Sequence, residues 1–302
     1  MNDAQLRLAF SGMHPGRVAK MVSTRGGASR ALRAIERGGG DVPDLARVAV
    51  AVPAAERRAE LAASGMAVVY LGGVGYPEHL ARWEDAPDVL FVRGDLPLEP
   101  GVAVVGTRKC TAYGREVATR YGTAIADAGW TLVSGLARGI DGAAHRGTVD
   151  AGGVGVAVLG CGLDVAYPRE HLRLGEGLVS LGGALVSEYP PGTRPDGWRF
   201  PLRNRVIAGL CRAVVVVEAA VTGGALITAN LAMEYGISVF AVPGDVDRDT
   251  SVGCNLLIRD GAHPVLDPAD LIEELALILG PPQSVGEGTT VAGVQSAPIK
   301  PG

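Results

Sequence analysis

Residues 133–145 read V-S-G-L-A-R-G-I-D-G-A-A-H and have the composition of a phosphate-binding turn. An apolar run ends at Ser134 and Gly135, and Gly139 precedes an Ala-rich segment that we expect to be helical. Glycine lets backbone N–H groups approach a phosphate, and the helix dipole favours negative charge at the N-terminus. Arg138 adds a cation at the edge of this turn. The sequence therefore predicts an anion site, for the phosphate of a nucleotide or of a nucleic acid.

A second turn combines glycine with cations after the apolar run 102–105, where the chain continues with Gly106, Thr107, Arg108 and Lys109. Arginine makes charge-assisted, two-pronged contacts to phosphate. The spacing matches neither G-x-G-x-x-G nor the P-loop, which weighs against binding of NAD or ATP. Arg108 is therefore a candidate phosphate ligand, and an ordinary strand-to-helix turn with a solvated arginine is the alternative.

A third basic segment, residues 198–205, reads W-R-F-P-L-R-N-R and precedes a predicted helix. It contributes Arg199, Phe200, Arg203, Asn204 and Arg205. Arginine clamps phosphate while an aromatic ring can stack on an unpaired base, so this mixture is typical of single-strand recognition.

A fourth turn again places glycines between an apolar strand and a helix. Thr222, Gly223 and Gly224 offer a hydroxyl and backbone donors to a phosphate. We therefore add these three residues to the predicted nucleic-acid site.

No catalytic set accompanies these turns in the sequence. The nucleophile pattern G-x-S-x-G is missing, and no His pair or carboxylate cluster has metal-ligand spacing. Asp141 is interpreted as a brace of its helix and His145 as a core histidine. The four cysteines form no C-x-x-C pair, which favours free thiols in a reducing, cytosolic compartment. The sequence thus favours binding over catalysis, without a cofactor or a metal.

The overall composition is that of a globular protein, with 47% hydrophobic and 20% charged residues. The net charge of −4 does not by itself indicate a nucleic-acid binder. Residues 194–212, however, contain five arginines and only one aspartate. No segment has the roughly 18 apolar residues of a membrane helix. We therefore expect a cytoplasmic protein with no membrane contact and a local basic groove.

Alternating apolar runs and helical segments position these turns. Strands are predicted at 67–71, 89–92, 102–105, 130–133, 155–159, 184–186, 213–217 and 239–242. Helices are predicted at 113–128, 142–150, 169–181, 225–235 and 268–279. The pattern predicts an α/β fold, an extended Rossmann-like, doubly wound and mostly parallel sheet over residues 63–280. Ligands of such folds bind at the carboxyl ends of strands, where the four turns lie.

Two flanking regions differ from this pattern. Residues 1–62 are rich in Ala and Arg and contain glycine turns, so we expect a small helical module of the SAM or helix-hairpin-helix type. A docking role is favoured for this module, and a DNA contact is the alternative. Residues 281–302 are expected to be a disordered tail.

Taken in order, the turns resemble those of the DprA (Smf) family of DNA-processing proteins. The matching patterns are V-V-G-T-R (104–108), S-G-x-A-x-G-I-D-x-x-A-H (134–145), F-P-x-R-N-R-x-I-A-G-L (200–210), V-V-V-E-A (215–219), G-x-L-I-T-A (224–229), V-P-G (242–244) and G-x-N-x-L-I-x-D-G-A (253–262). The resemblance implies a homodimer that binds single-stranded DNA, protects incoming DNA and loads a RecA-type recombinase during natural transformation and recombination. It also implies that Arg108 binds phosphate, that residues 134–139 supply backbone donors and that Arg203 and Arg205 line the groove.

Two positions depart from the family pattern. Asn230 and Leu202 stand where relatives often carry a basic residue, which lowers the positive charge of the predicted groove. The alternative function is that of a nucleotide-processing enzyme or nucleotide sensor of the related lysine-decarboxylase-like fold. That fold uses P-G-G-x-G-T-x-x-E, whereas Asn230 occupies the place of the acid here.

Overall fold

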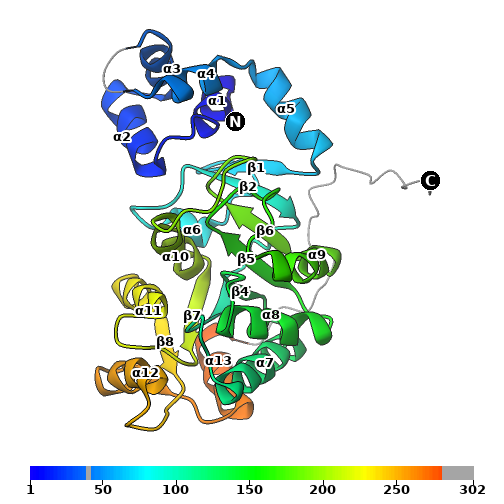
Figure 1. The fold of residues 1–302 in the computed structure, drawn as a ribbon, viewed down its shortest axis with the longest axis vertical. Coiled ribbons are helices and arrows are strands. Elements are labelled where there is room, and N and C mark those ends of the chain that lie inside the picture. The colour runs from blue at the N-terminus through cyan, green and yellow to red at the C-terminus, as the bar shows by residue number, and fades with distance from the viewer. Residues whose placement is uncertain (39–41, 281–302) are drawn as a thin grey trace, which may run out of the picture.

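A nine-stranded sheet organises the chain in the computed structural model, which describes residues 1–38 and 42–280 (Figure 1). The strand order is β1-β2-β6-β5-β4-β3-β7-β8-β9. Neighbouring strands are parallel except that β2 runs antiparallel to both β1 and β6. The strands are β1 (Ala67–Tyr70), β2 (Val89–Gly94), β3 (Gly101–Val105), β4 (Leu132–Ser134), β5 (Gly155–Leu159), β6 (Ala184–Ser187), β7 (Cys211–Val216), β8 (Ser238–Ala241) and β9 (His263–Pro264).

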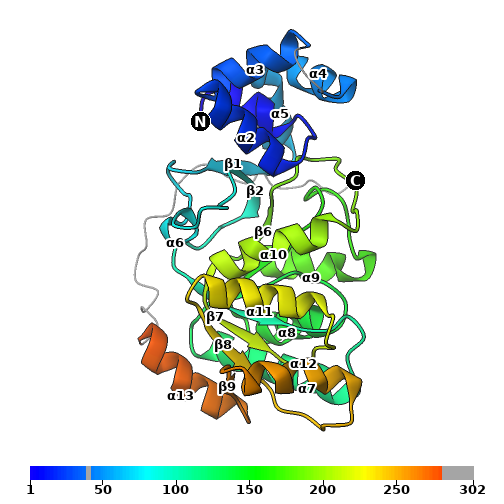
Figure 2. The same cartoon turned by 90° about the vertical axis from the view of Figure 1, so that its left-hand side faces the viewer.

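Helices cover both faces of this sheet, as Figure 2 shows. One face carries α7 (Ala112–Asp127), α8 (Ile140–Asp150), α9 (Leu172–Ser180) and α13 (Pro268–Leu279). The other carries α6 (Glu78–Ala81), α10 (Arg199–Gly209), α11 (Gly224–Glu234) and α12 (Asp249–Arg259). The central strands β3, β5 and β7 are almost wholly buried, as expected for parallel strands that are covered on both faces.

The chain changes direction across the sheet at β3 and β7. From β3 the connection through α7 leads to β4 on one side, whereas the crossover through α10 brings β7 to the other side of β3. The loops that leave these two neighbouring strands therefore diverge. Such a switch point opens a crevice at the carboxyl ends of the strands.

Five N-terminal helices precede the sheet: α1 (Asp3–Ala9), α2 (Pro15–Arg25), α3 (Ala28–Glu36), α4 (Asp44–Ala51) and α5 (Ala54–Ala63). They enclose a small core of their own around Ile35. Leu6 and Phe10 instead belong to a core shared with the sheet, and the Phe10 ring packs edge-on against Phe91 with centroids 5.4 Å apart. The helical module is thus joined to the sheet by buried apolar side chains.

The α/β, doubly wound architecture predicted from the sequence is confirmed. Three details differ. The segment 198–205 forms the first turns of α10 rather than a loop before it, because Pro201 falls in the first helical turn, where a missing N–H costs little. The helix expected at 169–181 begins as a separate 3-10 turn, η1 (Arg169–His171). Strand β9 is two exposed residues with no apolar run to reveal it. The tail at 281–302 lies outside the described residues.

No helix in the described ranges is long and apolar enough to cross a membrane.

Candidate functional site

A cavity of about 710 Å³ lies at the switch point between β3 and β7. Its walls come from the loops after β3 and β4, from α10 and from the N-terminus of α11. It brings together nine of the predicted site residues: Gly106, Thr107, Arg108, Lys109, Phe200, Arg203, Asn204, Gly223 and Gly224. All four sequence segments therefore reach one place, although residues 133–145 contribute Ala137 and Asp141 to the cavity and none of their predicted ligands.

The loop after β3 is held from below by Glu218. The Thr107 N–H donates to the Glu218 backbone carbonyl oxygen at 2.7 Å. The Glu218 carboxylate, which is buried, accepts the Thr111 N–H at 2.9 Å and the Thr111 hydroxyl at 2.6 Å. This anchoring leaves Arg108 and Lys109 exposed at the cavity, and neither forms an ion pair with any acid in the described ranges. Two uncompensated positive charges therefore face the cavity.

An aromatic surface adjoins these cations. The Arg108 guanidinium carbon lies 4.8 Å from the centre of the Phe200 ring, within the range of a cation–π contact. The Tyr167 ring lies on the loop after β5, and its centroid is 5.4 Å from that of Phe200. The cavity thus combines positive charge with two aromatic rings.

Arg203 forms part of the cavity floor and is only 4% exposed. It donates to the Gly135 carbonyl at 2.8 Å and to the Val158 carbonyl, and its Nε donates to Asn204 Oδ1 at 3.3 Å. Asn204 Nδ2 in turn donates to the Gly224 carbonyl at 3.1 Å. Burial lowers the pKa of Arg203 to about 10, and Asp141 opposes that effect, so the guanidinium stays charged at neutral pH. Its Nη1 and Nε donors are therefore committed to acceptors within the protein.

The turn after β4 is placed differently from what the sequence suggests. Ser134 is buried and donates its hydroxyl to the Val104 carbonyl at 2.6 Å, while the Gly135 N–H donates to Asp141 Oδ2 at 3.1 Å. Burial raises the pKa of Asp141, and the Arg203 charge opposes that effect. The Ser134 hydroxyl and the Gly135 N–H are therefore both used inside the protein, one by a backbone carbonyl and the other by the buried Asp141.

Gly139 shapes the same turn by letting two loops approach. Its φ is +78°, and an added Cβ would lie 2.2 Å from the carbonyl oxygen of Thr107. No other residue type fits this contact without moving the loop that carries Arg108. Gly139 lies outside the residues that line the cavity.

Arg138, Arg199 and Thr222 also lie outside the main cavity. Arg138 lines a small neighbouring cavity of about 50 Å³ together with Arg108 and Phe200, and it forms an ion pair with Glu170. The Arg199 guanidinium lies 4.9 Å from the Trp198 ring centre and 5.1 Å from that of Tyr189. Thr222 is exposed beside the start of α11.

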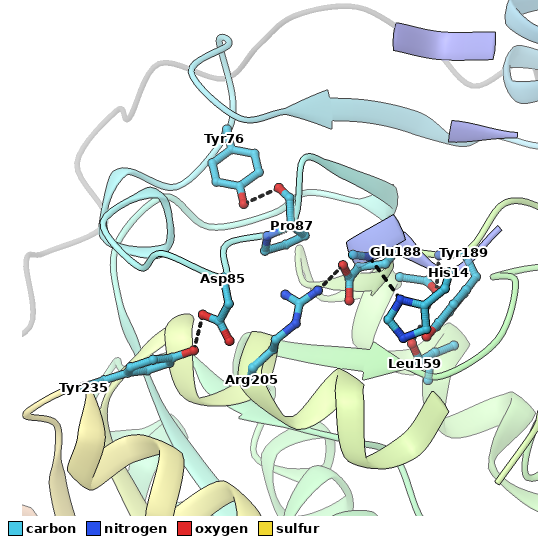
Figure 3. A network of polar contacts seen from close by, with 11 residues as sticks. His14, Tyr76, Asp85, Pro87, Leu159, Glu188, Tyr189, Arg205 and Tyr235 are labelled. Carbon is cyan, nitrogen blue, oxygen red and sulfur yellow. Dashed lines mark hydrogen bonds and ion pairs between the residues drawn. The ribbon is translucent and has the colours of Figure 1, made fainter. Parts of the chain in front are cut away.

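Arg205 lies on α10 but is not among the residues that line the cavity, and its side chain points toward Glu188 (Figure 3). Two residues along a helix turn the side chain by about 200°, so Arg203 and Arg205 cannot share a face. The Arg205 side chain is 16% exposed and pairs with the Glu188 carboxylate, whose side chain is 4% exposed. Burial raises the pKa of Glu188, and the Arg205 guanidinium opposes that effect. The expectation that Arg205 lines the groove is therefore not met by its position.

Tyr167 and Asp196 are among the cavity-lining residues that sequence reasoning missed. Tyr167 follows the predicted strand 155–159 and stands next to a proline, which is a pattern that can fix an aromatic ring at a strand's carboxyl end. Asp196 accepts a hydrogen bond from Trp198 Nε1 at 2.8 Å, a contact with no earlier signal in the sequence.

Comparison with known proteins places this site in a family. The profile described as DNA recombination-mediator protein A matches residues 67–276. The protein Smf of Escherichia coli is 45% identical over 66% of this chain, which spans about half (54%) of that relative's length. DNA processing protein DprA of Bacillus subtilis is 41% identical over 70% of this chain and 72% of its own length.

Two solved structures share the fold at substantial identity. DNA processing protein A of Streptococcus pneumoniae has a TM-score of 0.72 and 34% identity, covering 89% of this chain and 95% of that one. The Helicobacter pylori protein, whose structure is described for its single-stranded DNA binding mode, has a TM-score of 0.62 and 25% identity, covering 70% of this chain and 96% of that one. The chain therefore belongs to the DNA recombination-mediator protein A family.

Proposed function

We propose that this chain binds single-stranded DNA in the cavity at the carboxyl ends of β3 and β7. The observation that carries this proposal is the position of Arg108, which is unpaired in the described ranges and lies over the Phe200 ring. A phosphate and the base attached to it require this combination of a free cation beside an aromatic face.

The start of α11 supplies a second phosphate contact. The N-cap residue Gly223 has no side-chain cap, and an added Cβ at Gly224 would find no atom within 4 Å. Gly223, Gly224 and Ala225 line the cavity, so the start of this helix lies at the cavity wall, where the helix dipole favours an anion. Arg108 and Lys109 stand opposite, so the phosphate backbone would run between the loop after β3 and α11.

Selection of single strands follows from the rings. Phe200 and Tyr167 offer flat faces, and only an unpaired base exposes a matching face. The contacts proposed here go to phosphates and ring faces rather than to base edges, so binding should depend little on base sequence and strongly on salt. The role is one of binding rather than catalysis.

We further propose the cellular role that fits the family. A cytoplasmic homodimer would protect the incoming strand and load a RecA-type recombinase onto it during natural transformation and recombination. Membership in a recombination-mediator family supports this role. It is tested by measuring recombinase filament formation on strands coated with single-stranded DNA-binding protein, with and without this protein. Size-exclusion chromatography with light scattering tests the dimer.

The DNA-binding site is tested by fluorescence anisotropy with a labelled oligo-dT strand at several salt concentrations. We expect the double variant Arg108→Ala/Lys109→Ala to weaken binding of oligo-dT. The slope of log K against log salt concentration should become less negative by about 1.4, since each lost phosphate contact on a single strand removes about 0.7. Arg120→Ala/Arg146→Ala is the matched control, because both residues are exposed on α7 and α8 and line no part of the cavity.

Absence of binding by the native protein, or equal losses in the two double variants, would overturn the proposed site. Calorimetry with nucleoside monophosphates separates the alternative. Saturable binding of a free nucleotide, with no oligo-dT binding, would assign the cavity to a nucleotide sensor.

A further inference from the structure

Positive charge is concentrated at the N-terminal end of an otherwise acidic chain. Residues 4–35 contain six Arg or Lys and no Asp or Glu, whereas the whole chain carries a net charge of −4. The proposed single-strand cavity uses none of these cations. Their purpose therefore has to be sought in the helical module.

Two classes account for nine of the ten Arg and Lys residues of this module. Four arginines are ion-paired and stabilise the module: Arg7 with Glu36, Arg47 with Asp44, Arg57 with Glu60 and Arg58 with Asp3. Five others are exposed, lie on or just after α2 and α3, and form no ion pair within the described ranges: Lys20, Arg25, Arg30, Arg33 and Arg37. The uncompensated charge is thus confined to one helical hairpin, at the top of the view in Figure 1.

A tight glycine turn joins the two helices of this hairpin. Gly26 and Gly27 have φ values of +70° and +124°, and Gly27 caps α3 without any side-chain hydrogen bond. The Arg30 guanidinium lies over the turn, since an added Cβ at Gly26 would be 3.0 Å from Arg30 Nη1. The positive end of the α3 dipole and a guanidinium therefore occupy the same spot.

The remaining cations extend this positive surface along α3. Arg30, Arg33 and Arg37 are spaced three and four residues apart, which puts them on one side of the helix. The span from the first to the last is about 10 Å at 1.5 Å per residue. A row of charges of this length fits a polymer with repeated phosphates better than a single small anion.

We propose that the α2–α3 hairpin binds the phosphate backbone of duplex DNA. Residues 15–38 contain no aromatic side chain, so this surface cannot stack on an unpaired base as Phe200 can. A rigid polyanion recognised through phosphates alone is the matching ligand. A membrane surface is disfavoured because the large exposed apolar residues of the module, Leu45 and Val48, lie on α4 and not on the basic hairpin.

The hairpin and the cavity are connected through one aromatic contact. His14, at the start of α2, stacks on Trp198 with ring centroids 5.2 Å apart and an interplanar angle of 18°. Trp198 is hydrogen-bonded to Asp196, which lines the cavity. A DNA molecule with a duplex part and a single-stranded part would therefore engage both surfaces of the same chain.

The test uses the full chain and three labelled probes: a blunt duplex of 20 base pairs, oligo-dT, and a duplex with an oligo-dT tail. We expect Arg30→Ala/Arg33→Ala to weaken duplex binding about tenfold. The slope of log K against log salt concentration should become less negative by about 1.8, because each lost phosphate contact on a duplex removes about 0.9. The affinity of this variant for oligo-dT should change less than twofold. The tailed duplex should bind more tightly to the native protein than either simple probe, because the two contacts reinforce each other.

Arg108→Ala/Lys109→Ala should show the opposite pattern, with oligo-dT binding weakened and duplex binding kept, so failure of either site is recognised separately. Arg120→Ala/Arg146→Ala controls for the loss of two positive charges, and circular dichroism melting checks that each variant is folded. The proposal is overturned if the native protein does not bind the duplex, if Arg30→Ala/Arg33→Ala binds it like the control, or if oligo-dT displaces it completely. Binding to phosphatidylglycerol vesicles without duplex binding would assign the hairpin to a membrane instead.

Discussion

The Arg203 guanidinium donates a hydrogen bond of 2.8 Å to the Gly135 carbonyl oxygen, and this contact fastens α10 to the turn after β4. Arg203, which the sequence predicts to be a DNA ligand, thus stabilises the floor of the cavity. An added Cβ at Gly135 would lie 2.4 Å from Arg203 Nη1, so the two positions leave room only for each other. The distinction between binding and supporting arginines can be measured.

We expect Arg203→Ala to lower the free energy of unfolding by about 3 kcal/mol, because it leaves buried carbonyl groups without their donor and the buried Asp141 carboxyl without its neighbouring positive charge. Arg108→Ala should stay within about 0.5 kcal/mol of the native value, since its side chain is exposed. Urea unfolding monitored by circular dichroism measures both. Equal stability of the two variants would contradict the structural role of Arg203.

Arg205 should behave in the same way for a different reason. Its replacement by alanine leaves the Glu188 carboxylate buried without a partner, and we expect a loss of about 3–5 kcal/mol. The double variant Arg205→Met/Glu188→Leu should recover most of that loss, because two apolar side chains of similar size need no partner. Urea unfolding of both single variants and the double variant completes the cycle. Simple additivity of the two single losses would argue against the pair.

Glu170 restrains a cation next to the cavity. It pairs with Arg138, and the hydrogen bond from Arg138 lowers the pKa of Glu170 to about 2, so this carboxylate is charged at any working pH. We expect Glu170→Gln to release Arg138 toward phosphate and to tighten oligo-dT binding about two- to threefold at low salt, with a steeper salt dependence. Glu116→Gln, on exposed α7, is the charge-matched control. An unchanged salt dependence in Glu170→Gln would show that Arg138 does not reach the strand.

His145 makes stability depend on pH. Burial, together with the charge of nearby His171, lowers the pKa of His145 to about 3, whereas the unfolded ring titrates near 6.5. Below pH 6.5 the unfolded state takes up the proton first, so the stabilising contribution is complete above that pH and is lost as the pH falls toward 3. We expect a loss of about 2 kcal/mol between pH 7 and pH 5 from this residue alone. Urea unfolding of His145→Leu at both pH values should show a loss of unfolding free energy between pH 7 and pH 5 that is smaller by that amount than in the native protein.

The location of the cavity is well predicted by the sequence, but the sequence does not predict which residues face the cavity and which support the fold. Glycine turns after buried strands determine where loops meet, and Gly106, Arg108 and Gly223 meet as expected. The division of labour within residues 198–205 depends on where α10 begins, since a shift of one residue rotates every side chain by about 100°. Pro201 obscured that start. The Gly135 N–H is bound inside the protein by Asp141, whose role as a brace was predicted but whose partner was not.

The packing of Phe10 against Phe91 has a consequence for how the molecule handles its substrate. A module tied on by a flexible linker would let two bound segments of DNA point in any direction. Here the buried Phe10 and Phe91 rings hold the helical module, through the end of α1, against the sheet that carries the cavity, so the angle between a bound duplex and its departing strand would be set by the fold. The protein would hold the duplex and the departing strand at a fixed angle rather than tether them flexibly.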